Sequence, residues 1–126
     1  MRLIILTNKE RSTTMSINEF MLENNIAIFV EVDVPGKSFN TYKSDIELEY
    51  YSLYEQLILY SDAESLAGTV EGQIMPQTWR QGNTRCVVCK INEEKLVFLF
   101  YDSEADPISN YNYSIELNNK VIKLMS

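Results

Sequence analysis

Alternating apolar and polar residues predict a strand early in the chain and a hairpin that follows it. Residues 25–34 are rich in β-branched side chains, and from Val30 onward valines alternate with acidic residues, as in a strand with one face in water. Pro35-Gly36 then supplies the chemistry of a turn. Residues 38–43 can return beside this strand as its hairpin partner.

The second half of the chain predicts three consecutive strands, over residues 73–80, 84–91 and 95–101. Polar residues at 81–83 and 92–94 separate them as turns. The run from Leu96 to Tyr101 holds only apolar and aromatic residues, so both of its faces must be covered. We therefore place this run at the centre of an antiparallel sheet of about five strands.

Two helices are predicted before and between these strands. Ser16-Ile17-Asn18-Glu19 has the spacing of a capping box, which predicts a short N-terminal helix ending near residue 24. Residues 45–50 alternate like a strand, but over residues 45–60 apolar side chains recur every three or four positions. We predict a helix over residues 45–67 that ends at Gly68. Its start stays open, because Ser44 and Ser52 each have a glutamate three residues later.

The outer side of the helix predicted at 45–67 is unusual. Opposite its core stripe it would carry four large apolar residues beside carboxylates, namely Leu48, Tyr51, Ile58 and Leu59. A helix with one solvated face does not normally place such residues there. Either both sides are covered within the domain, or the outer side meets another chain.

The C-terminal tail predicts a hairpin. Asp106-Pro107 interrupts the chain, and Asn118-Asn119 tolerates positive φ. A hairpin there would pair Ile115 with Ile122 and Tyr113 with Leu124; a terminal helix is the alternative.

These elements together predict a single α+β domain over residues 1–126, whose sheet is packed by one main helix and the short N-terminal helix. Residues 1–14 are either an edge strand or a leader, because Met15 is a possible second start.

Charge is distributed unevenly along the chain. Residues 44–79 contain seven carboxylates and no lysine or arginine, within a chain of net charge −7. This balance argues against nucleic acid and anionic lipid as partners. It is compatible with a basic protein partner, since complementary charge speeds association. The alternative is that acidity serves solubility alone.

The residue types needed for catalysis are sparse. The chain has no histidine, the side chain that titrates nearest neutral pH. Cys86 and Cys89 form a C-x-x-C on a predicted strand, where residues three apart lie about 10 Å apart on opposite faces, too far for a disulfide. Two cysteines without histidine also cannot complete a zinc site. We therefore expect two free, partly buried thiols.

Two apparent ligand-binding patterns fail on inspection. Asp102, Glu104 and Asp106 are spaced as in a calcium loop, but Pro107 and Tyr113 stand where that loop needs glycine and glutamate. Gly36-Lys37-Ser38 resembles the end of a phosphate loop but lacks the earlier glycine. We expect no metal, no cofactor and no enzymatic activity.

Seven residues are candidates for contact with a protein partner. Carboxylates would steer and pair with basic groups of the target, tyrosines would add contact area at low entropic cost, and tryptophan and arginine are enriched at binding hot spots. The candidates are Glu47, Tyr51, Tyr54, Glu55, Asp62, Trp79 and Arg80.

The prediction is a non-catalytic, acidic inhibitor of a basic protein, of the kind that bacteria use as toxin immunity proteins and phages use against host defences. No apolar run reaches the length of a signal-peptide core or a membrane span, so we expect the cytoplasm. Monomer and homodimer both stay open, and so does a small-molecule sensor with a pocket lined by tyrosine and methionine.

The predicted order of helix, strand, strand, helix and three strands resembles the roadblock and profilin-like α/β domains. Those domains pack one sheet against helices, and the resemblance implies a dimeric adaptor or GTPase-regulator module as the second hypothesis. The predicted C-terminal hairpin departs from the terminal helix that those domains usually have.

Overall fold

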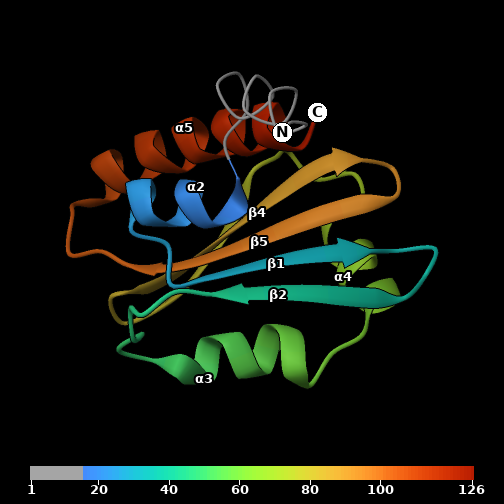
Figure 1. Ribbon diagram of the computed structural model, residues 1–126, viewed down its shortest axis with the longest axis horizontal. Coiled ribbons are helices and arrows are strands. Elements are labelled where there is room, and N and C mark those ends of the chain that lie inside the picture. The colour runs from blue at the N-terminus through green and yellow to red at the C-terminus, as the bar shows by residue number, and fades with distance from the viewer. Residues whose placement is uncertain (1–15) are drawn as a thin grey trace, which may run out of the picture.

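An antiparallel sheet of five strands forms the middle layer of the protein (Figure 1), in a computed structural model that describes residues 16–126. The strands are β1 (Ile28–Asp33), β2 (Ser38–Lys43), β3 (Gln77–Gln81), β4 (Thr84–Asn92) and β5 (Lys95–Asp102). They lie in the order β2-β1-β5-β4-β3, and each neighbouring pair is antiparallel. The strand or leader predicted within residues 1–14 falls outside the described residues.

The predicted centre of the sheet is confirmed. β5 lies between β1 and β4, and all residues from Leu96 to Tyr101 are buried. Even-numbered residues of this run face one core and odd-numbered residues face the other. The run lacks the usual alternation with polar residues because helices cover both of its faces.

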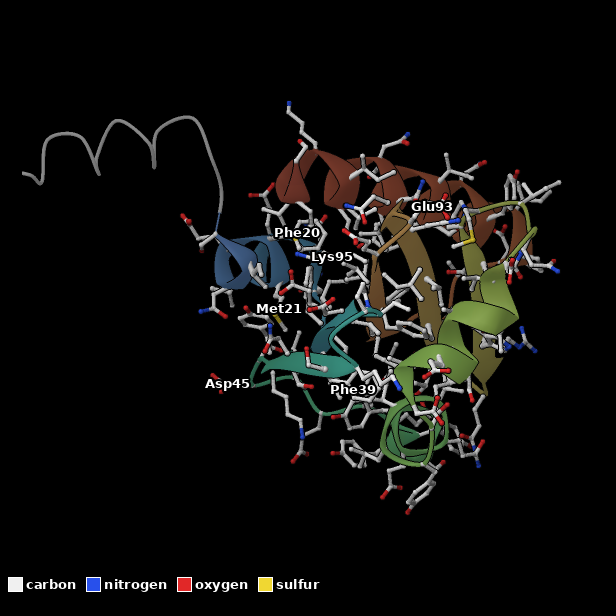
Figure 2. The ribbon with its side chains drawn as sticks, turned by 90° about the vertical axis from the view of Figure 1, so that its right-hand side faces the viewer. Phe20, Met21, Phe39, Asp45, Glu93 and Lys95 are labelled. Carbon is white, nitrogen blue, oxygen red and sulfur yellow. The ribbon has the colours of Figure 1, made fainter. Side chains whose placement is uncertain are left out.

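Helices lie on both sides of the sheet, as Figure 2 shows with the layers seen from the side. One side carries α2 (Ile17–Asn24) and α5 (Pro107–Met125), and we call it the α5 face. The other side, the α3 face, carries α3 (Tyr51–Tyr54), a π-helical turn η1 (Glu55–Leu59) and α4 (Ala63–Val70). The predicted α+β class, with an antiparallel sheet and a short N-terminal helix, is therefore confirmed.

The predicted capping box begins α2. The Ser16 Oγ accepts the Glu19 N–H at 3.1 Å, and the Glu19 carboxylate accepts the Ser16 N–H at 3.0 Å. Phe20 and Met21 follow in the next turn and are buried in the core of the α5 face (Figure 2). These local bonds and the apolar pair fix the helix against the sheet.

The prediction of one continuous helix over residues 45–67 is wrong. Residues 45–50 form an irregular loop, the helix begins at Tyr51, and it is interrupted after Leu59 before α4 continues to Val70. Neither predicted serine cap forms: the Ser44 Oγ donates to the Ile26 carbonyl at 3.0 Å, and the Ser52 Oγ donates to Gln81 at 2.8 Å.

Distant side chains explain the late start of this helix. The Glu49 N–H donates to an Asp102 carboxylate oxygen at 2.8 Å, and the Tyr50 N–H donates to the Thr84 Oγ1 at 2.9 Å. The Thr84 hydroxyl in turn donates to Asp102 at 2.6 Å. Because the N–H groups of Glu49 and Tyr50 donate to side chains of β4 and β5, tertiary contacts hold this segment as a loop and the helix begins only after it.

The predicted C-terminal hairpin is also wrong, and the alternative of a terminal helix is right. The Asp106 carboxylate accepts the Ser109 N–H at 2.8 Å, and Pro107 occupies the first turn, as at many helix starts. Asn118-Asn119 lies within α5. The buried residues of α5 recur at helical spacing toward the sheet; they are Asn110, Ser114, Leu117 and Val121.

The prediction that both thiols are free is confirmed, but they are fully buried instead of partly buried. Cys86 and Cys89 are free, and they are buried in different cores, Cys86 on the α3 face and Cys89 on the α5 face. Burial raises the pKa of the Cys86 thiol well above its usual value and that of the Cys89 thiol to about 12. Neither thiol is therefore an activated nucleophile.

Candidate interaction surface

The helical turn after the 45–50 loop divides into a buried side and an outer side. Leu53, Tyr54 and Ile58 point into the core of the α3 face. On the outer side, Tyr51 is 40% exposed, Leu59 53% and Tyr60 75%. These exposures leave large apolar groups in water on the segment that also carries the carboxylates.

We define the acidic aromatic surface as the outer residues of this segment. Tyr51, Glu55 and Leu59 follow one another at intervals of four along α3 and η1, which places them on neighbouring turns of one side. Ile46 and Glu47 adjoin Tyr51 across a shared hollow. The surface consists of Ile46, Glu47, Tyr51, Glu55, Leu59, Tyr60 and Asp62.

The hollow beside Tyr51 has a volume of about 370 Å³ and lies between the 44–48 loop and the ends of β1 and β2. Lys43 lines it and donates from Nζ to the Tyr51 hydroxyl at 3.0 Å. The same Nζ lies 5.3 Å from the ring centres of Tyr51 and Tyr54. The hydrogen bond to Tyr51 is the main reason that the pKa of Lys43 is raised. The contact with Lys43 fixes the Tyr51 ring at the rim of the hollow.

Asp62 combines a structural task with its charge. Its carboxylate accepts the Ser65 N–H at 2.8 Å and so begins α4. Chiefly because of this backbone hydrogen bond, the pKa of Asp62 lies below its ordinary value. The exposed carboxylate is therefore fixed in place and ionised at neutral pH.

Tyr54 is the one predicted contact residue that the structure removes from the surface. It is 3% exposed, and its ring meets Phe100 edge-on with the ring centres 5.4 Å apart. Its role is packing in the core of the α3 face. Glu47 and Glu55 are on the surface, but Glu47 reaches it from the loop instead of from a helix.

Trp79 and Arg80 do not form one contact site. They are neighbours on β3, so their side chains point to opposite sides of the sheet. Trp79 is half-buried against the core of the α3 face. Arg80 is exposed and lies opposite Arg85 of β4. Arg85 lies on the α5 face, like its neighbours Val87 and Tyr101.

Sequence reasoning placed some residues of this segment wrongly and missed one pairing. Of the four apolar residues predicted on the outer side of the helix, Tyr51 and Leu59 are exposed, but Ile58 is buried and Leu48 packs against the core. Ile46 and Tyr60, which the helical period placed on the core stripe, are exposed. The Arg80–Arg85 pair could have been found, because a two-residue turn at Gly82-Asn83 makes those arginines cross-strand partners.

Residues 16–126 contain no cluster of metal-ligating side chains. The carboxylates of the apparent calcium loop have separate tasks: Asp102 holds the 45–50 loop and Asp106 begins α5. Within the same range, no helix combines the length and apolar character needed to cross a bilayer.

Comparison with known proteins adds no family: no family model matches the chain, and no curated protein matches it.

Proposed function

We propose that the protein is a non-catalytic inhibitor that docks its acidic aromatic surface on a basic protein target and blocks the target's basic site. The observation that carries the proposal is the exposure of Tyr51, Leu59 and Tyr60 among carboxylates. Burial of these groups on docking would supply hydrophobic stabilisation, and aromatic contacts do so at low entropic cost.

The carboxylates of this surface are available to a partner. Among the described residues, Glu47, Glu55 and Asp62 form no ion pair. Glu64 differs, because it pairs with Lys37 at 2.7 Å. Unpaired carboxylates around apolar contacts fit a target rich in lysine and arginine, and their field would speed association.

We also propose a cytoplasmic location and a bacterial or phage context of the immunity or anti-defence kind. Free thiols are compatible with a reducing compartment, although these two lie in different cores and so could not pair in any compartment.

The test compares two variants of equal net charge. Glu47→Gln, Glu55→Gln and Asp62→Ser together remove the surface charge, and serine keeps an acceptor for the Ser65 N–H. The control triple, Glu23→Gln, Glu94→Gln and Glu104→Gln, changes exposed carboxylates elsewhere. Each protein is used for affinity capture from the source cells at about 0.1 M and about 1 M salt.

We expect the control to capture the same basic protein as the wild type, and the surface variant to lose it at low salt. Leu59→Ser with Tyr60→Ser should weaken capture at both salt concentrations, because apolar contacts are not screened. If the surface triple binds the target as tightly as the wild type at low salt, the proposal is wrong.

A second candidate is a roadblock-like dimeric adaptor or GTPase-regulator module, in which the acidic aromatic surface is the homodimer seam. The presence of α5 favours it, because a terminal helix completes the order of elements in the domains that the sequence resembles. It ranks second because two copies of an acidic surface repel each other. Light scattering separates the two: a dimer that persists at about 1 M salt supports the adaptor, and a monomer supports the inhibitor.

A further inference from the structure

Two arginines lie side by side on the α5 face. Arg80 of β3 and Arg85 of β4 are directly opposite each other in the antiparallel ladder. Such partners have Cβ atoms about 5 Å apart, and like charges there are unfavourable. Within residues 16–126 neither arginine forms an ion pair, although the chain has 18 acidic residues.

The Arg85 guanidinium is partly withdrawn from water without an acceptor. Its Nε is buried, and no described residue accepts a hydrogen bond from it. A buried donor without an acceptor is unfavourable. The pair therefore holds two positive charges and an unused donor in one place.

Both arginines line a cavity of about 190 Å³ between the start of α5 and the β3–β4 edge of the sheet. Its lining residues include none with a carboxylate. Beside the arginines, the walls are mainly Val87, Tyr101, Pro107 and Tyr111. The cavity is thus positive at one side and apolar or aromatic at the other.

We propose that this cavity binds a phosphate group, held by the guanidinium groups of Arg80 and Arg85. A phosphate monoester carries a charge near −2 at neutral pH, which matches two arginines, and guanidinium and phosphate form bidentate hydrogen bonds. At about 30 Å³ for each water in the liquid, the cavity has room for a phosphate and a few atoms of its carrier.

The start of α5 is already occupied by an anion. Asp106, its capping residue, accepts hydrogen bonds from the Ser109 N–H at 2.8 Å and the Ser109 Oγ at 3.0 Å. The attraction for a phosphate therefore comes from the two arginines and not from the positive end of the helix. Tyr111, which is 65% exposed, offers a ring to whatever carries the phosphate.

The phosphate could belong to a free small molecule or to a phosphorylated side chain of another protein. Isothermal titration calorimetry at constant ionic strength distinguishes the two sources. The ligands are inorganic phosphate, phenyl phosphate and a phosphotyrosine peptide, and the unphosphorylated peptide is the control. Phenyl phosphate that binds at least as tightly as the peptide identifies a small molecule, and a peptide that binds about tenfold tighter or more identifies a phosphoprotein.

Arg85→Gln and Arg80→Gln should each weaken phenyl phosphate binding about tenfold or more, the usual loss for a charge-assisted hydrogen bond. Lys123→Gln removes an exposed cation near the far end of α5 and should leave binding unchanged. Binding should also be stronger at about pH 7.5 than at about pH 5.5, because the second phosphate pKa is about 6.

A separate variant distinguishes binding from folding. Arg85→Met removes the buried donor and should keep or raise the unfolding midpoint in urea while binding is lost. If neither phosphate nor phenyl phosphate binds at millimolar concentration, or if both glutamine variants bind like the wild type, the proposal is overturned.

Discussion

The two faces of the sheet are covered in different ways. On the α5 face, one helix of 19 residues and a capped helix of eight close the core. On the α3 face, the cover consists of a loop and three short helical pieces of four, five and eight residues. The short pieces leave Leu59 and Tyr60 exposed, and the regular helices of the α5 face likewise expose Leu22, Ile108 and Tyr111. The faces differ instead in what fixes their cover. Side chains at the helix ends begin α2 and α5, whereas Thr84 and Asp102 of the sheet fix the loop before α3.

The two faces also differ in charge. The α3 face carries the acidic aromatic surface, while the α5 face carries Arg80 and Arg85 beside a cavity. Opposite charges on opposite sides allow two separate ligands to bind without competing, so each proposal can fail while the other stands.

The largest expected effects come from the two cores. Phe100→Ala on the α3 face should cost about 3–5 kcal/mol of unfolding free energy, and Leu117→Ala on the α5 face about 2–5 kcal/mol, since both side chains are fully buried. Urea denaturation measures both. Leu59→Ala is the control, with an expected change within about 0.5 kcal/mol. If Leu59→Ala lowered the free energy of unfolding as much as Phe100→Ala does, Leu59 would have to be buried in solution.

A pair of glycine substitutions tests how the 45–50 loop is held. Gly82 has φ of +58°, and a Cβ there would overlap the Tyr50 ring. Gly82→Ala should therefore cost about 1–2 kcal/mol or more. Gly68→Ala in α4 has open space and should stabilise the protein by about 0.5–1 kcal/mol. Equal effects in urea titrations would show that neither the positive φ of Gly82 nor the Tyr50 ring constrains this turn.

The reaction rates of the two buried thiols report how often each face of the sheet opens to solvent. Cys86 lies under the broken layer and Cys89 under α5. We expect alkylation in native buffer to modify Cys86 faster, by about tenfold for each 1.4 kcal/mol of difference in opening free energy. Mass spectrometry of the two peptides measures the rates, and both thiols should react equally fast in urea. Faster modification of Cys89 would reverse the comparison.

The smallest expected effect is the response of the two helix caps to acid. Hydrogen bonds from Ser65 and Ser109 lower the pKa values of Asp62 and Asp106 below 3.8. A carboxyl whose pKa is lower in the folded state stabilises the protein at pH values above its pKa in the unfolded chain. This stabilisation is lost as the pH falls through the pKa of the folded state.

Asp62→Ser and Asp106→Ser keep an acceptor but do not titrate. Each should therefore lose less stability than the wild type between about pH 5 and about pH 2. Thermal unfolding across this range checks both variants. A wild-type pH profile in either variant would mean that its cap is not linked to folding.

Sequence reasoning succeeded where the signal was local. The capping box at Ser16 needs only four residues, and the apolar run at 96–101 needs only a strand covered on both sides. The opposite placement of Cys86 and Cys89 follows from strand periodicity alone. In each case, residues close together in the sequence are enough to explain the structure that forms.

The failures share a different cause. The helical period over residues 45–60 predicted a helix from residue 45, yet Asp102 and Thr84 accept hydrogen bonds from the N–H groups of Glu49 and Tyr50. In the tail, Asn118-Asn119 suggested a turn, but burial of Leu117 and Val121 against the sheet favours the helix. Tertiary packing overrode local preference in both segments.

The sequence by itself determined the five strands, the central position of β5, the first helix and the concentration of acid in the middle third. Only the tertiary structure decided which acidic and aromatic residues face water, that Tyr54 belongs to the core, and that two arginines share a cavity. Exposure and cross-strand contact depend on groups far apart in the chain, so a local pattern cannot fix them.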